Sequence, residues 1–162
     1  MNGAIASSAT AAGDWSGVRR FGALLESHRY SPRPSAYGFT VDAHGQVAVV
    51  RSEDGCFLPG GGIEAGETPE RAVVREGLEE CGLLLRVGAC VTRAVQFSYS
   101  ASDGAWYEKL CWFFTTEIAA EHPAAQLPGH EVLWLTRAEA IDALAHESQQ
   151  WAMREWTAQS RA

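Results

Sequence analysis

Three closely spaced glutamates are the residues of this chain best suited to metal chemistry. Glu76, Glu79 and Glu80 fall at positions i, i+3 and i+4 of a helical pattern, so they share one face of the expected helix. Carboxylates held this close repel one another, and a fold that keeps them together is expected to neutralise them with a cation. Their hard oxygen atoms favour Mg²⁺, with Mn²⁺ as a substitute. The opposite face carries residues that can pack against the protein: Val74, Gly77, Leu78 and Cys81.

The helix that carries these glutamates has clear ends in the sequence. Thr68 is expected to cap it, Pro69 suits its first position, and Gly82 supplies a stop. Just upstream, residues 58–62 read L-P-G-G-G, and glycines let the backbone approach a ligand or metal closely. The carbonyl group of Gly60 is therefore a further candidate metal ligand.

This stretch resembles the Nudix box of the Nudix hydrolases. Gly61 is followed after five residues by Glu67, and after seven more by the run R-E-G-L-E-E-C-G-L from Arg75 to Leu83. One position departs from the family pattern, because Gly77 stands where an aliphatic residue is usual. Glycine inside a helix costs about 0.5 to 1 kcal/mol relative to alanine, so we expect a close helix contact at Gly77 and no loss of activity.

The resemblance implies a fold and a reaction. The fold would be of the α/β (α+β) class, an α/β/α sandwich with a mixed β-sheet. The reaction would be metal-dependent hydrolysis of a nucleoside diphosphate linked to another moiety. Carried over by position, the family assigns Glu76, Glu79 and Glu80 as catalytic metal ligands, with Glu76 also a candidate general base. The other roles it implies are Gly60 as a carbonyl ligand, Arg75 as a catalytic residue that holds the carboxylates, Glu67 and Gly61 as supporting residues, and Glu131 or Glu108 as an assisting carboxylate from a later loop.

Substrate choice depends on residues outside the box. Tyr99 lies sixteen residues after Leu83, where a dinucleoside polyphosphate branch of the family tends to have a tyrosine. We therefore place dinucleoside polyphosphates slightly ahead of nucleoside triphosphates and nucleotide sugars, with Tyr99 and Arg51 as candidate substrate contacts. A strand residue without substrate contact is an equally good interpretation of Tyr99.

Two other interpretations remain open. Without the glycine run, an E-x-x-E-E helix is more often a solvated charged face than a metal site. A Nudix domain can also lose turnover and bind a nucleotide as a sensor or scaffold, although such domains usually lose box glutamates and this chain keeps them.

Size and charge limit the remaining classes of function. The chain has 162 residues, and its formal net charge of −7 argues against general nucleic-acid binding. Its four cysteines lack a C-x-x-C pair and are expected to be reduced core residues of a cytoplasmic protein.

No stretch of the sequence is suited to span a bilayer, so we expect no association with a membrane. The expected partner is a small-molecule substrate, and a homodimer is left as an alternative to a monomer. Residues 1–14 are expected to be a disordered tail, and residues 15–162 a single domain.

The elements around the box are expected to alternate between sheet and helix. Residues 15–33 suit a short helix or an edge segment, ended by Pro32 and Pro34. Strands are expected over 36–41 and 46–51, joined by a hairpin turn over 42–45, and over 56–58, 84–87, 89–99, 106–116 and 131–135, with a turn over 100–104. Thr136 and Glu139 predict a capping box that opens a helix through Ala145, and a last helix is expected over 151–156.

Overall fold

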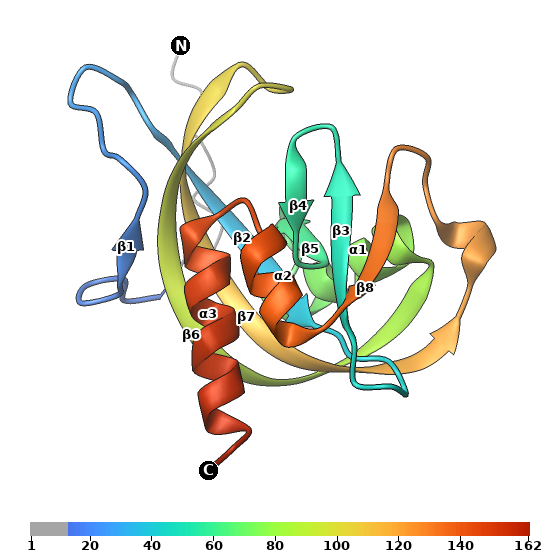
Figure 1. Ribbon diagram of the computed structural model, residues 1–162. Coiled ribbons are helices and arrows are strands. Elements are labelled where there is room, and N and C mark those ends of the chain that lie inside the picture. The colour runs from blue at the N-terminus through green and yellow to red at the C-terminus, as the bar shows by residue number, and fades with distance from the viewer. Residues whose placement is uncertain (1–12) are drawn as a thin grey trace.

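The computed structural model describes residues 13–162, which form two β-sheets and three α-helices (Figure 1). The tail expected to be disordered over residues 1–14 lies outside the described residues, apart from its last two positions. Within the described part, no helix has both the length and the apolar character needed to cross a membrane.

A five-stranded mixed sheet forms the centre, in the order β1-β6-β7-β2-β5. Strands β6 and β7 pair as a long antiparallel hairpin, whereas β2 runs parallel to β7 and β1 runs parallel to β6. Strand β5 adds the glycine run to the other edge of β2. The bounds of these strands are β1 Arg20–Phe21, β2 Ser31–Phe39, β5 Gly60–Gly62, β6 Leu83–Ser100 and β7 Ala105–Glu121.

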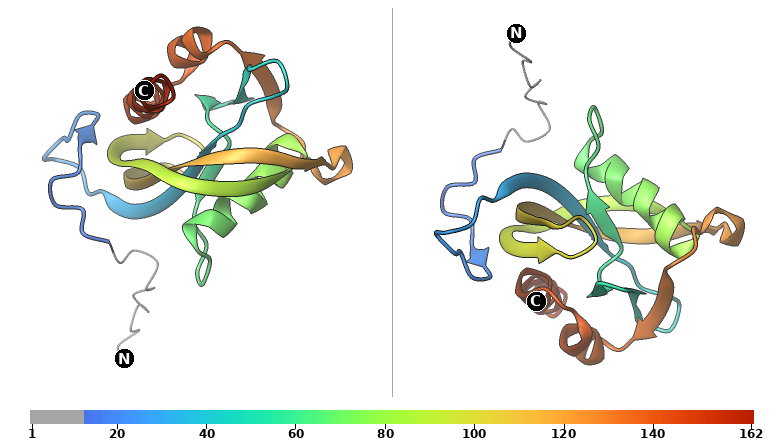
Figure 2. Two further views of the ribbon diagram at one scale, coloured as in Figure 1. Left: turned by 90° about the horizontal axis from the view of Figure 1, so that it is seen from below. Right: turned by 90° about the horizontal axis from the view of Figure 1, so that it is seen from above.

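A second, three-stranded sheet has the order β4-β3-β8, with β3 at Val47–Ser52, β4 at Gly55–Phe57 and β8 at Glu131–Leu135. Helix α1 (Pro69–Cys81) lies on one face of the central sheet, and α2 (Arg137–Ala143) and α3 (Glu147–Gln159) lie on the opposite side (Figure 2). A short 3₁₀ helix, Pro123–Ala125, precedes β8. The mixed sheet between helices confirms the expected fold class.

Helix α1 follows its sequence signals closely. The Thr68 side chain accepts a hydrogen bond from the backbone N–H of Arg71, and Gly82 ends the helix in the left-handed conformation, with φ of 64°. The most buried positions are Ala72, Val73 and Gly77, whereas Val74, Leu78 and Cys81 are only partly buried. The packed face is therefore turned slightly from the expected one, although Gly77 belongs to both.

Gly77 makes the close contact expected of it. A Cβ atom at this position would lie 2.7 Å from Leu85 Cδ1 and 3.1 Å from the carbonyl oxygen of Leu83. The first of these contacts is too short to form without a shift of Leu85, and the second is tight. The absent side chain therefore lets α1 approach the start of β6.

Of the two alternatives for residues 15–33, the edge segment is correct and the short helix is wrong. This segment contains only the two-residue edge strand β1, and β2 already begins at Ser31 and includes both prolines. The carbonyl oxygen of Pro34 accepts a hydrogen bond from Ile63 N–H, so the position of its missing N–H faces the β5 edge and not β7. The parallel pairing with β7 is therefore compatible with both prolines.

The other boundaries differ in smaller ways. The turn over residues 42–45 is present, with Asp42 N–H bound to the Gln46 carbonyl at 2.9 Å, but the strands it joins belong to different sheets. The two strands expected over 84–87 and 89–99 are one continuous strand, with β-bulges between Val87 and Thr92. Strand β8 and the capping box of α2 are as expected, although α2 ends at Ala143.

The core contains two main clusters of apolar residues on either side of the central sheet. On one side, Phe39 of β2 stacks on Trp156 of α3 with ring centroids 4.7 Å apart. On the other, Val73 of α1 packs into a cluster that includes Leu85 and Phe114. The four cysteines are free, as expected, but Cys90 is exposed and only Cys111 is fully buried.

Candidate active site

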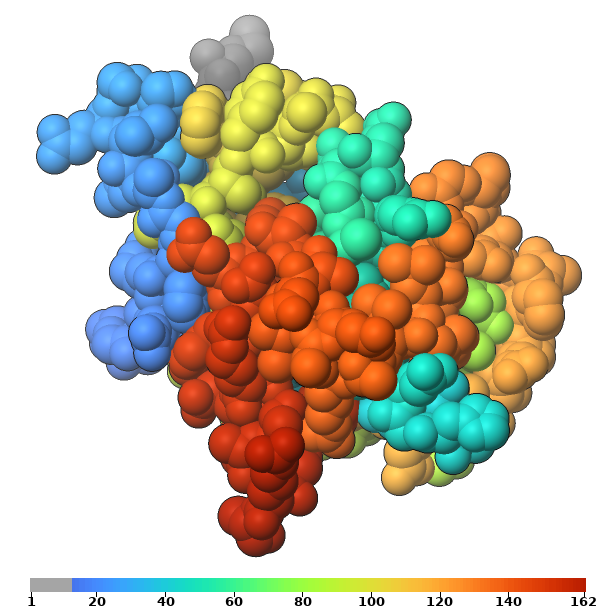
Figure 3. Space-filling model, viewed as in Figure 1, coloured from blue at the N-terminus to red at the C-terminus, as the bar shows by residue number. Residues whose placement is uncertain are grey.

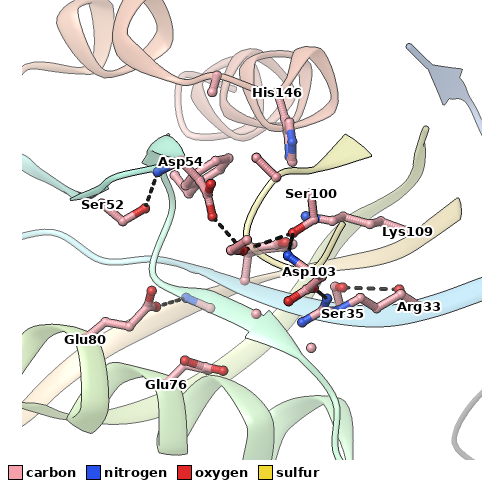
Figure 4. A pocket seen from close by; sticks show the side chains of 18 of the residues that line it. Arg33, Ser35, Ser52, Asp54, Glu76, Glu80, Ser100, Asp103, Lys109 and His146 are labelled. Atoms are coloured by element: carbon pink, nitrogen blue, oxygen red, sulfur yellow. Dashed lines mark hydrogen bonds and ion pairs between the residues drawn. The ribbon is translucent and has the colours of Figure 1, made fainter. Parts of the chain in front are cut away.

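A cavity of about 390 Å³ lies where α1, β5 and the tips of two hairpins meet. The space-filling view shows the β3–β4 hairpin in turquoise beside the tip of the β6–β7 hairpin in yellow, and both contribute lining residues (Figure 3). Figure 4 shows the cavity from close by. Its floor is formed by Glu76, Glu80 and the glycines of β5, and its other walls carry Arg33, Asp54, Asp103, Lys109, Tyr99 and His146.

Glu80 joins the helix to the glycine strand. Its Oε1 accepts a hydrogen bond from the backbone N–H of Gly60 at 2.8 Å, and His130 Nε2 lies 3.9 Å from its Oε2. Burial disfavours the carboxylate and raises the pKa of Glu80 to about 8, although the Gly60 hydrogen bond opposes the shift and the charge of Glu76 adds to it. Before any cation binds, Glu80 is thus a poorly neutralised buried acid.

Glu76 lies against the next glycine. A Cβ atom at Gly61 would be 2.7 Å from Glu76 Oε1, so the glycine leaves the room that this carboxylate occupies. Burial raises the pKa of Glu76, and the hydrogen bond from Arg75 partly offsets that effect. Gly60 is more tightly constrained, because a Cβ there would lie 2.1 Å from the Ala36 carbonyl oxygen, whereas a Cβ at Gly62 would lie 3.1 Å from Nε of the flexible Arg33 side chain.

Arg75 connects the acidic residues of the box. Its guanidinium donates two parallel hydrogen bonds to Glu67, at 2.8 and 2.9 Å, and a third to the Gly62 carbonyl at 2.9 Å. It also donates to Glu76 at 2.9 Å and to Glu79 at 3.3 Å. The bonds to Glu67 raise the pKa of Arg75 well above its usual range and lower the pKa of Glu67. In this arrangement Arg75 orients the carboxylates.

The three glutamates are not equivalent. Glu76 and Glu80 line the cavity, whereas Glu79 turns toward Arg75 and does not. Among residues 13–162, no three acidic, histidine or cysteine side chains converge in a geometry ready for a metal ion. The oxygen atoms of Glu76 and Glu80 beside a bare glycine backbone nevertheless fit a hard divalent cation, and their unfavourable burial is relieved by one.

Two predicted carboxylates and one predicted substrate contact lie elsewhere. Glu131 of β8 forms an exposed ion pair with Arg51 of β3, and Glu108 of β7 pairs with Arg20 at 2.6 Å. None of these residues lines the cavity. Tyr99, in contrast, lies at the cavity with 52% of its surface exposed, and its ring centroid is 5.0 Å from that of Trp106.

The opposite side of the cavity was not anticipated from the sequence. Arg33 donates to Asp103 at 2.7 Å, and Asp54 accepts from Ser102 at 3.0 Å across the gap between the two hairpin tips. Burial lowers the pKa of His146 to about 3, which keeps its imidazole neutral, and burial also lowers the pKa of Lys109. One feature of the sequence could have drawn attention to this side of the cavity, because Lys109 is the only lysine in the chain.

Comparisons with known proteins identify the family of the chain. The NUDIX domain matches residues 31–159, most of the chain. An ADP-ribose pyrophosphatase of Methanocaldococcus jannaschii is 65% identical over 34 residues, a match that spans 20% of this chain and 20% of that protein. The fold is similar to that of a NUDIX hydrolase from Nitrosomonas europaea, with a TM-score of 0.65 and 18% identity over 80% of this chain and 90% of the other. It is also similar to a C. elegans Ap4A hydrolase, with a TM-score of 0.60 and 16% identity over 80% and 98% of the two chains. The chain therefore belongs to the NUDIX family.

Proposed function

We propose that this protein hydrolyses the diphosphate bond of a nucleoside diphosphate linked to another moiety, with divalent cations held at Glu76 and Glu80. The observation that carries the proposal is the pair of largely buried carboxylates against Gly60 and Gly61, in the floor of a cavity whose other walls carry Arg33 and Lys109. The match to an ADP-ribose pyrophosphatase and the fold shared with an Ap4A hydrolase support the same class of reaction.

The position of each residue suggests its role in the reaction. Bound Mg²⁺ or Mn²⁺ would neutralise the diphosphate and lower the pKa of a coordinated water. Glu76 and Glu80 would hold the ions together with the Gly60 carbonyl, and Glu79 on the same helix would be a further ligand. Glu76 accepts the proton of the attacking water, while the P–O–P bridge breaks to release two phosphorylated products. Arg75 and Glu67 keep Glu76 in place through the hydrogen bonds already described.

A panel of substrates tests the proposal. Purified protein is incubated with diadenosine tetraphosphate, nucleoside triphosphates, nucleotide sugars and ADP-ribose, with Mg²⁺, with Mn²⁺ and with EDTA. Turnover is expected only with metal, with dinucleoside polyphosphates ahead of the others. ADP-ribose as the fastest substrate would overturn that order, although not the reaction class.

The alternative is a NUDIX domain that binds nucleotides without turnover. This alternative would be favoured if the protein hydrolyses no substrate of the panel but binds a nucleotide in a calorimetric titration. The complete set of box glutamates argues for turnover, because ligand binding alone does not require three clustered carboxylates.

A further inference from the structure

Arg33 and Lys109 form a like-charged pair on neighbouring strands. They lie directly opposite each other in the parallel register of β2 and β7, and both line the cavity. Like charges at directly opposite positions on one face of a sheet destabilise it. A fold that retains such a pair in a cavity is suited to binding an anion there.

Arg33 has an acidic partner, whereas Lys109 has none within hydrogen-bonding distance in the described part of the chain. Arg33 donates to Asp103 at 2.7 Å, and its guanidinium carbon lies 4.7 Å from the centroid of the Tyr107 ring. Among residues 13–162, the ammonium group of Lys109 has neither a hydrogen bond nor an ion pair with any side chain. Asp54, the other carboxylate on this side of the cavity, is exposed and is bound by Ser102. Lys109 therefore has donors available for a ligand.

The surroundings of Lys109 increase what such a ligand would gain. Burial lowers the pKa of Lys109, because its ammonium is partly removed from water without a partner. Asp103 and Asp54 oppose this shift only in part, and neither makes a hydrogen bond or an ion pair with Lys109. A phosphate oxygen placed beside the ammonium would supply the hydrogen bonds that it lacks, and hydrogen bonds between ionised groups are the stronger kind. Figure 4 shows Lys109 on the side of the cavity away from Glu76 and Glu80.

We propose that Lys109 binds a substrate phosphate beyond the two that lie at Glu76 and Glu80, and so favours nucleoside triphosphates and dinucleoside polyphosphates. ADP-ribose and nucleotide sugars carry only the two phosphates of the cleaved bond, and they leave Lys109 without an anion. The inference rests on the proposed function for the position of the cleaved diphosphate.

The single lysine allows a test that does not depend on turnover. An amine-acylating reagent is applied to the wild-type protein with excess nucleotide and Mg²⁺, and acetylation of Lys109 is followed by peptide mass spectrometry. ATP at about ten times its dissociation constant should slow the reaction roughly tenfold, as expected for occupancy of one site. ADP-ribose at the same saturation should slow it less than about twofold. Equal protection by both ligands, or protection by neither, would overturn the proposal.

Kinetics of a charge-removing variant provide the second test. Lys109→Gln should lower kcat/KM for ATP and diadenosine tetraphosphate about 10- to 100-fold, the range for one charge-assisted hydrogen bond, and change ADP-ribose less than about threefold. Lys109→Arg should recover most of the loss. Arg86→Gln is the matched control, because it removes one positive charge from an exposed ion pair with Glu117 outside the cavity.

The two tests separate the failure of this inference from the failure of the proposed function. A protein without turnover can still show protection of Lys109 by ATP, which would support the phosphate contact alone. A protein that hydrolyses the whole panel while Lys109→Gln lowers all substrates equally would retain the function and lose the inference. Lys109→Gln should also melt at or above the wild-type temperature, because it removes the repulsion from Arg33; a much lower melting temperature would assign Lys109 a structural role instead.

Discussion

The carboxylate of Glu80 accepts a hydrogen bond from the backbone N–H of Gly60 at 2.8 Å, and this bond joins the end of α1 to the glycine strand. The bond partly compensates a largely buried acid that lies near two groups of the same charge, Glu76 and Glu79. The carboxylate that anchors the floor of the cavity is thus unfavourable to folding in the absence of a cation.

The stability of the metal-free protein should therefore fall as pH rises. Glu80 has a pKa of about 8 when folded against 4.5 for the free side chain, so between these values the folded state holds a proton that the unfolded state has lost. Stability should decrease between about pH 5 and pH 8 by up to about 4 kcal/mol. Urea unfolding in EDTA at several pH values measures the slope.

Glu80→Gln should remove much of that slope and stabilise the metal-free protein at pH 8. The amide oxygen can still accept the Gly60 hydrogen bond, and no charge is buried. With saturating Mg²⁺ the same variant should lose at least about 10²-fold in kcat. A variant that unfolds more easily at pH 8, or that turns over at the wild-type rate, would contradict the assignment of Glu80 as a metal ligand.

Gly61→Ala should damage activity more than stability. The added Cβ would meet Glu76 Oε1 at 2.7 Å, and a carboxylate at the end of a flexible side chain can move away, at the expense of its position in the cavity. We expect a loss of at least about tenfold in kcat with a stability change within about 1 kcal/mol.

Gly60→Ala is the contrasting variant. Gly60 has φ of 146°, and its added Cβ would meet the backbone oxygen of Ala36 at 2.1 Å. We expect a loss of more than about 2 kcal/mol, measured by urea unfolding. Gly66→Ala, at φ of 78° with open space around it, controls for backbone strain alone and should cost about 1 kcal/mol.

Gly77→Ala should destabilise the protein, although alanine favours helices. The helix would gain about 1 kcal/mol from propensity, but the contact with Leu85 Cδ1 at 2.7 Å should cost about 1 to 3 kcal/mol. Thermal melting of Gly77→Ala and of the double variant with Leu85→Val tests the clash, since the smaller partner should recover part of the loss. Kinetics of Gly77→Ala at a temperature where it is folded should be close to wild type.

Arg75→Lys should separate the role of geometry from that of charge. Lysine keeps the positive charge but cannot make the paired bonds to Glu67 together with those to Gly62 and Glu76. We expect a loss of about 1 to 3 kcal/mol and a lower kcat, because Glu76 is less well oriented. Arg71→Lys, at an exposed position of the same helix, should change neither the melting temperature nor kcat.

The predictable parts of this structure depend on local signals. Helix α1 could be placed from Thr68, Pro69 and Gly82 because caps act within one turn, and Glu76 and Glu80 followed from helical spacing. The start of β2 could not be placed in this way. Its two prolines suggest the end of an element, but β2 tolerates them because it pairs with β7, which is distant in the sequence.

The pairing of Arg33 with Lys109 could not be predicted for the same reason. Arg33 and Lys109 meet only through the parallel pairing of β2 with β7, and nothing near either residue in sequence indicates that pairing. Glu131 and Glu108 were candidates because the family resemblance implies an assisting carboxylate from a later loop. In the structure each forms an ion pair with an arginine, and neither lines the cavity.

The single lysine also allows the opening of the central sheet to be measured by proteolysis. Lys109 lies in β7, the central strand of the five-stranded sheet. A protease specific for lysine can therefore cut the chain at one site, and that site is within the sheet. Cutting there requires the pairing of β7 with both β6 and β2 to open. The rate at which a single cleavage divides the chain between residues 109 and 110 would therefore follow the population of molecules in which this end of the sheet has opened.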